Sequence, residues 1–180
     1  MKEVDRLLAA AAQARARFLA SVGGLSPAQA TFKPESARWS ILEITEHVVH
    51  AEDAGVGGMW RALDGYRRDE PIWSGNPVHR GLPIEEVVAR TWQPKEQVPE
   101  VAAPRRGGSL SYWMAALRSR QQVLEELAKA LSGAALEEII YPHPISGPLD
   151  VRQRLEFLRF HLDRHRSQVE VLKSEPEYPQ

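Results

Sequence analysis

Four stretches of the chain repeat apolar residues at the spacing of an amphipathic α-helix. They cover residues 4–22, 41–51, 109–131 and 150–173, and the second extends to residue 63 if the helix tolerates the glycines at 55, 57 and 58. No stretch alternates apolar and polar residues convincingly enough to predict a β-strand. Since each helix must bury its apolar stripe against another, the pattern predicts an all-α protein built as a four-helix bundle.

Residues that start and stop helices agree with these limits. Ser40 and Glu43 have the spacing of a capping box before the second helix, and Ser109 and Asp150 can cap the third and fourth. Gly23-Gly24 and Ser132-Gly133 end the first and third helices. We therefore expect a single domain over residues 1–173, followed by a frayed tail at 174–180.

The connection between the second and third helices, residues 64–108, is long and rich in proline and glycine. A short amphipathic helix over residues 83–92 is the only regular element that it predicts. Loops of this length in compact domains are usually functional or poorly ordered. Trp73 and Trp92 favour an ordered connection. Two roles are open for them: they line a pocket over one end of the bundle, or they pack only for stability.

Composition narrows the class of protein. The 23 Lys and Arg nearly balance the 24 Asp and Glu, which argues against a partner such as nucleic acid or an acidic membrane. No apolar run is long enough to span a bilayer, and the first residues do not have the pattern of a signal peptide. The chain has no cysteine, which excludes disulfides and thiolate ligands and fits a cytoplasmic location.

Histidines supply the candidate chemistry. His161 and His165 stand four apart, so their imidazoles project from one face of the last helix. His47 lies at the edge of the buried stripe of the second helix, and with the pair it would give three ligands and leave positions open, as in catalytic metal sites. Three nitrogens suit zinc, nickel, iron or cobalt without choosing among them. The alternative is that His47, His161 and His165 are ordinary histidines, either hydrogen-bonded in the core or at the surface. His50 is expected to be partly exposed, and His79 is expected to be solvated in a loop.

Other residues could support such a site, although none is singled out as catalytic. Glu43 lies one turn before His47 and could accept a hydrogen bond from it, but capping already explains this glutamate. Arg120 interrupts the apolar stripe of the third helix and could reach the site. Trp73 could line the pocket.

Two segments of the sequence resemble the DinB-like family. Residues 39–52, which begin Trp39-Ser40 and contain His47 eight residues after the tryptophan, are similar to the motif that opens the family's second helix. Residues 143–149, followed by the helix with His161, His165 and Gln168, resemble the other end of the family, and Phe32-Lys33-Pro34 and the stretch at 103–104 also fit. The resemblance covers nearly the whole chain.

The resemblance implies a DinB/YfiT-like four-helix bundle that holds a divalent metal, with zinc, nickel or iron as candidates, through His47, His161 and His165. Relatives include bacillithiol S-transferases and mycothiol-dependent maleylpyruvate isomerases, so it implies a metal-dependent thiol S-transferase that joins a small-molecule thiol to an electrophilic substrate. A metal-dependent hydrolase is the alternative, as is a non-catalytic, metal-stabilised binding or stress-response bundle. It also implies a homodimer.

Overall fold

The computed structural model describes residues 3–93 and 97–180, and within them the chain is helical, with two isolated β-bridges and no strand. Four helices are long: α1 (Glu3–Val22), α3 (Ile41–Arg67), α5 (Leu110–Ala130) and α6 (Val151–Lys173). The short elements of the described chain are α2 (Pro27–Thr31), α4 (Ile84–Thr91) and the 3₁₀ turns η1 (Glu100–Ala102) and η2 (Leu136–Glu138). The all-α prediction is confirmed.

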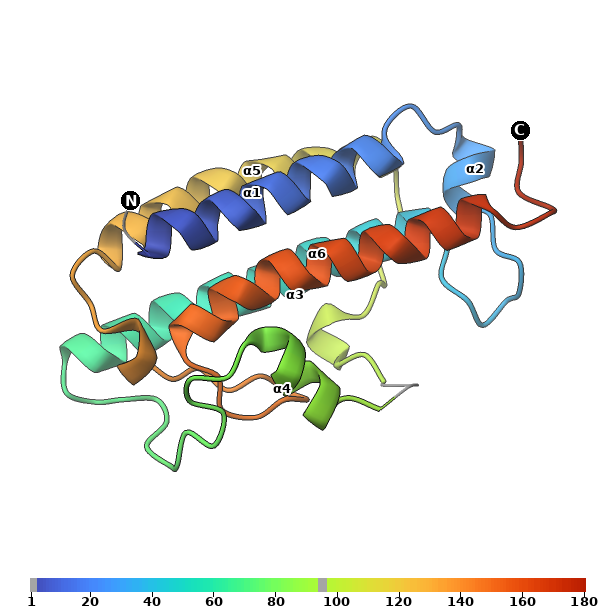
Figure 1. The fold of residues 1–180 in the computed structure, drawn as a ribbon. Helices are drawn as coiled ribbons and strands as arrows, with labels where there is room; N and C mark the ends of the chain where they lie inside the picture. The colour runs from blue at the N-terminus through green and yellow to red at the C-terminus, as the bar shows by residue number, and fades with distance from the viewer. Residues whose placement is uncertain (1–2, 94–96) are drawn as a thin grey trace.

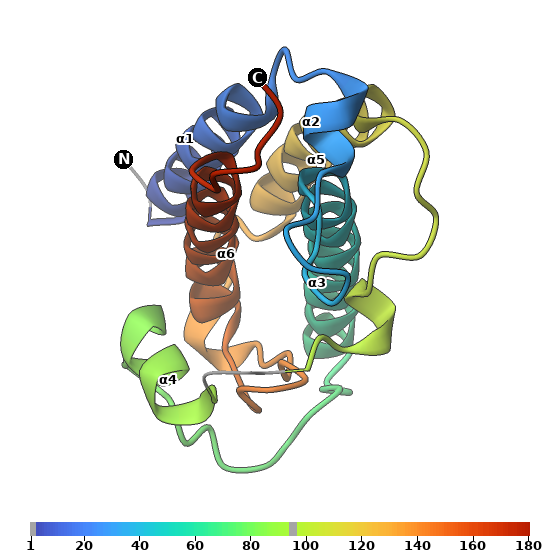
Figure 2. The ribbon, with the colours of Figure 1, turned by 90° about the vertical axis from the view of Figure 1, so that its right-hand side faces the viewer.

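The long helices form a bundle in which α1 packs chiefly on α6, and α3 packs on both α5 and α6. Viewed end-on, they occupy four corners, with α1 and α6 on one side and α3 and α5 on the other (Figure 2). α1 and α6 run in one direction, and α3 and α5 run in the opposite direction (Figure 1). The order is thus up-down-down-up. The long connection after α3 makes this possible because it returns the chain to the end where α3 began.

The predicted caps set the helix starts. The hydroxyls of Ser40 and Ser109 accept hydrogen bonds from backbone N–H groups in the first turns of α3 and α5, and the Asp150 carboxylate does the same for α6. Ser40 with Glu43, and Asp150 with Gln153, form complete capping boxes. Each cap satisfies N–H groups that the helix itself leaves unpaired.

Helix α3 continues without interruption past Gly55, Gly57 and Gly58 to Arg67. Gly58 has a packing reason, since a Cβ there would lie 1.9 Å from the ring of Tyr141. Gly55 likewise leaves room for Arg154, whose Nη2 would be 3.2 Å from an added Cβ. The cost of glycine in a helix is therefore offset by two large side chains that approach the α3 backbone.

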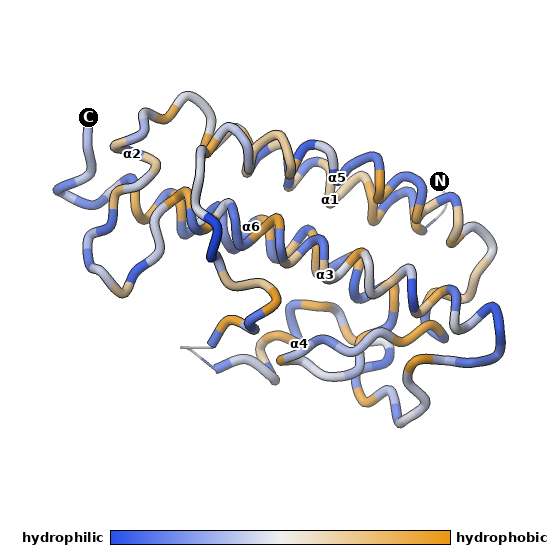
Figure 3. The backbone as a smooth tube through the Cα atoms, turned by 180° about the vertical axis from the view of Figure 1, so that it is seen from behind, coloured by the Kyte–Doolittle hydropathy of each residue, from blue (hydrophilic) through white to orange (hydrophobic). Residues whose placement is uncertain are grey.

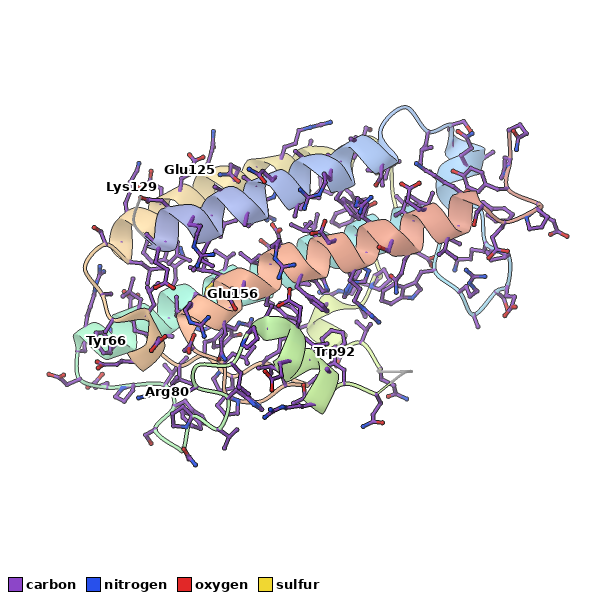
Figure 4. The ribbon with its side chains drawn as sticks, in the orientation of Figure 1. Tyr66, Arg80, Trp92, Glu125, Lys129 and Glu156 are labelled. Atoms are coloured by element: carbon purple, nitrogen blue, oxygen red, sulfur yellow. The ribbon has the colours of Figure 1, made fainter. Side chains whose placement is uncertain are left out.

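Apolar side chains of the four long helices fill the centre of the bundle, and hydrophobic and hydrophilic positions alternate along each helix (Figure 3). Charged residues such as Glu125 and Lys129 lie on the exposed surface of α5 (Figure 4). A buried ion pair joins two helices: Arg15 of α1 binds Glu52 of α3 at 3.0 and 3.1 Å, and Gln121 accepts a third hydrogen bond from Arg15. None of the helices in the described ranges has both the length and the apolar character of a membrane span.

The connection between α3 and α5 covers one side of the α3–α6 layer (Figure 1). Helix α4, close to the predicted short helix, buries Ile84 and Val87 against Leu149 and Phe157. The tail after α6 departs from the prediction that it frays. Tyr178 is buried and meets the ring of Phe32 edge-on, because the residues around α2 offer an apolar surface that the sequence pattern does not reveal.

Candidate metal centre

The three histidines predicted from the sequence meet between α3 and α6. The Nε2 atom of His47 lies 3.1 Å from that of His161 and 3.1 Å from that of His165, and the last two are 3.0 Å apart. All three side chains are buried. Their proximity follows from the packing of α3 on α6, since His161 and His165 share one face of α6 and His47 lies opposite them.

Hydrogen bonds at Nδ1 fix the tautomer of two of the imidazoles, those of His47 and His165. His47 Nδ1–H donates to the carbonyl oxygen of Ala102 at 2.8 Å, and His165 Nδ1–H donates to Oε1 of Gln168 at 2.7 Å. Both oxygens can only accept, so both Nδ1 atoms carry the proton. In the neutral rings, each Nε2 then presents a lone pair to the other across 3.1 Å.

Burial disfavours the charged form of all three rings. It lowers the pKa of His47 to about 4 and the pKa values of His161 and His165 well below their usual value, and the neighbouring histidines lower them further. The site therefore contains neutral imidazoles at neutral pH, which is the form that binds metals.

The donor set fits a divalent cation. A triangle of nitrogens with sides of 3.0–3.1 Å can be bridged by one ion at the usual metal–nitrogen distance of about 2.0–2.1 Å. A cation there would also remove the repulsion between facing lone pairs. Within the described residues, these three histidines form the one group of three or more histidine, aspartate or glutamate side chains whose ligand atoms converge closely enough for an ion.

Glu46, the residue before His47, holds the segment that contains Ala102 against α3. The carboxylate of Glu46 is buried and accepts hydrogen bonds from the backbone N–H groups of Arg105, Arg106 and Gly107 at 2.6–2.9 Å. One turn of α3 thus provides both a candidate ligand and the anchor for the segment whose Ala102 carbonyl fixes that ligand's proton.

A cavity of about 980 Å³ opens beside the histidines. Its walls come from α3, α6, η1 and the residues around Trp92 and Tyr141, and they are mostly apolar and aromatic. Trp92 follows α4 on the side of the bundle that carries the long connection (Figure 4). This size and lining are those of sites that bind small molecules.

The three supporting residues considered from the sequence lie elsewhere. Glu43 caps α3 through Ser40 and pairs with Lys33, and no hydrogen bond joins it to His47. Arg120 pairs with Asp53 outside the cavity. Trp73 lines a different, shallow depression of the surface beside Tyr66, so the reading that it lines the main pocket is not supported.

His50 differs from its predicted exposure. It is buried, with Nε2 3.3 Å from Glu46 and its ring edge-on to Trp113, because α5 covers α3 on this side. His79, in contrast, lies in the connection, where its Nε2–H donates to the carbonyl of Ser146.

Sequence reasoning did not place Tyr141, His143 or Arg154 at the cavity, yet all three line it. A signal for Arg154 was present: it precedes His161 by seven residues, and that spacing places both on one face of a helix. Tyr141 and His143 belong to an irregular connection, for which no periodicity gives a direction.

The fold and the site together define a helical bundle with a candidate open three-histidine metal centre. The family model of the DinB superfamily matches residues 10–169, and the chain belongs to this superfamily. A similar protein is the uncharacterized protein YuaE of Bacillus subtilis (strain 168), which is 27% identical over 167 residues, covering 92% of this chain and 96% of that protein. No solved structure matches the chain significantly.

Proposed function

We propose that this protein is a metal-dependent thiol S-transferase that joins a low-molecular-weight thiol to an electrophilic small molecule. The observation that supports it best is the pair of lone pairs on His47 and His165, which face each other across 3.1 Å beside a large apolar cavity. A divalent ion held by the three histidines would lower the pKa of a thiol and so favour the nucleophilic thiolate. With no cysteine in the chain, the sulfur would come from the small-molecule thiol.

The chain's own residues would position the reactants. His47, His161 and His165 would hold the ion beside the cavity, from which the thiol would reach it. The apolar walls around Phe157 and Trp92 would bind the electrophile and keep water from competing with the thiol.

The arrangement of carboxylates favours thiol transfer over hydrolysis. A hydrolase of this kind would need a carboxylate base beside the ion, and the sequence offered Glu43, Glu46 and Glu52. In the structure Glu43 caps α3, Glu46 accepts three backbone N–H groups, and Glu52 pairs with Arg15. Each carboxylate already has partners of its own.

The test measures metal content of the protein as purified and then conjugation of 1-chloro-2,4-dinitrobenzene to a panel of low-molecular-weight thiols. Chelation and His161→Ala should each abolish turnover, and zinc or nickel should restore it only to the chelated wild-type protein. His79→Ala is the matched control, because this histidine lies outside the cavity and should leave turnover unchanged.

Other outcomes separate the alternatives. Full activity in verified metal-free protein would overturn the proposal. Turnover of ester substrates without added thiol would instead support the hydrolase, and a large metal-dependent rise in Tm without any turnover would support a structural metal.

A further inference from the structure

Arg154 is a buried cation with no anionic partner among the residues that the structure describes. Its side chain is only 6% exposed and lines the cavity. Its Nη1 is buried without a hydrogen-bond partner, and no ion pair or hydrogen bond joins the guanidinium to the described part of the chain. Buried charges in proteins are ordinarily paired, so an unpaired guanidinium that faces a cavity indicates a ligand.

Aromatic rings hold this guanidinium in place without neutralising it. Its central carbon lies 4.6 Å from the centre of the Tyr141 ring and 5.9 Å from that of Phe157. Burial lowers the pKa of Arg154 to about 10, which leaves it charged at neutral pH. Contacts with aromatic rings do not use the N–H groups of Arg154, which keep their capacity to donate.

The glycines of α3 make room for this arrangement. Gly55 lies against Nη2 of Arg154, and Gly58 admits the ring of Tyr141, whose hydroxyl donates to the carbonyl of Ala54. A side chain at either position would displace the guanidinium or its supporting ring. The site is therefore built from α3, α6 and the connection between α5 and α6.

We propose that Arg154 binds a carboxylate of the substrate or of the thiol, so that the ligand is a monoanionic molecule with an apolar body. A planar carboxylate matches the paired N–H groups of a guanidinium, and a single buried cation suits a single negative charge. This inference rests on the proposed function only where it says that the bound carboxylate belongs to the substrate or to the thiol. The anion site itself does not depend on the proposed function.

The helix fixes how far the carboxylate lies from the reacting atoms. Seven residues separate Arg154 from His161, which is about 10 Å along the axis of α6. Phe157 lies between them, close to both Arg154 and the ring of His161. The expected ligand therefore has its carboxylate separated from the reactive centre by an apolar segment that packs on Phe157.

The test compares two probes of nearly equal shape, 4-phenylbutanoate and its neutral amide, by calorimetric titration of the protein as purified. The wild type should bind the acid at least about tenfold more tightly than the amide, the value expected for hydrogen bonds to a charged group. Arg154→Met should bring the ratio close to one and leave the affinity for the amide unchanged. Arg159→Met is the control, because this half-buried arginine of the same helix pairs with Glu85 outside the cavity and should keep the full preference.

Two further measurements keep the proposal falsifiable. Arg154→Met should not lower Tm, since it removes an unpaired buried charge, whereas a purely structural arginine would lose stability. If this variant fails to fold, Gly55→Ala provides the second test, because it retains the charge but crowds the guanidinium and should also reduce the acid preference. A preference for the acid that survives both substitutions would overturn the proposal.

Chelation distinguishes this site from the metal centre. The preference for the acid should persist in metal-free protein. If it disappears with the metal, the carboxylate binds at the histidines and the Arg154 site is wrong. If the protein holds no metal but Arg154 still selects the acid, the proposed function fails and the anion site stands.

Discussion

Two hydrogen-bond acceptors that are not candidate ligands themselves determine which ring nitrogen of His47 and of His165 has the free lone pair. Ala102 accepts from His47 and Gln168 accepts from His165, and each thereby directs the opposite ring nitrogen toward the shared centre. Such partners commonly matter for metal affinity almost as much as the ligands do. The Gln168 contact is a side-chain interaction, so it can be tested by substitution.

Gln168→Leu is expected to weaken zinc binding about 10–100-fold, because the Nδ1–H of His165 loses its acceptor and the ring its orientation. Competition with a chromophoric chelator measures the affinity. Gln168→Glu should act in the opposite direction, since a carboxylate accepts the same hydrogen bond more strongly.

Ser167→Ala is the control for this prediction. Ser167 is the neighbouring residue, and its hydroxyl donates only to a backbone carbonyl of α6. An equal loss of affinity in Ser167→Ala and Gln168→Leu would show that Gln168 acts through the general integrity of the helix.

The sequence could predict that His161 and His165 lie on one face, because helical spacing fixes the relative directions of side chains on one element. That His47 joins them was implied by the resemblance to the DinB-like family. The sequence could not predict their hydrogen-bond partners. Ala102 is a backbone acceptor in a proline-rich connection, and its position depends on Glu46 holding residues 105–107. Glu43 was the nearest carboxylate by spacing, yet the cap of α3 occupies it.

At the scale of elements, α3 contains two kinds of glycine. A Cβ at Gly58 would collide with the ring of Tyr141, whereas a Cβ at Gly57 would have Nη1 of Arg61 as its nearest neighbour, at 3.8 Å. The same helix thus contains one glycine that packing requires and, directly beside it, one that packing does not.

Gly58→Ala should destabilise the protein by about 1–3 kcal/mol, because the added methyl group forces the Tyr141 ring to move. Gly57→Ala should instead stabilise it by about 0.5–1 kcal/mol through helix propensity. Urea unfolding of the two variants measures both signs, and destabilisation by Gly57→Ala would contradict this account of the helix.

Helix limits could be predicted well because caps act locally. Ser40, Ser109 and Asp150 satisfy N–H groups within their own first turns, so their effect is visible in a few residues of sequence. The burial of His50 and the docking of Tyr178 could not be predicted, since both depend on which distant element covers the residue.

At the scale of the whole molecule, the sequence pattern does not predict in which direction each helix runs through the bundle. The spacing of apolar residues specifies which face is buried but not which neighbour covers it. The sequence also predicts a homodimer, and α5 offers exposed apolar side chains in Tyr112 and Val123, which are 55% and 41% exposed. Eleven residues apart, they lie on one face of the helix.

We expect sedimentation velocity to give a mass of twice 20.2 kDa at micromolar concentration. Val123→Asp should shift the distribution toward the monomer if α5 forms the contact, with Glu125→Gln as a control on a different face of the same helix. A single species of 20.2 kDa at all concentrations would remove the homodimer prediction.

The separation of His47 from His161 along the chain, 114 residues, has a consequence for how the protein matures. The pair on α6 comes together as soon as that helix forms, but His47 joins it only when α3 has docked. Bringing such distant residues together also costs chain entropy, and this cost grows with the logarithm of the loop length. Full-affinity loading with an ion would therefore be a late event in refolding, and its kinetics would report the arrival of the last helix rather than the formation of the first.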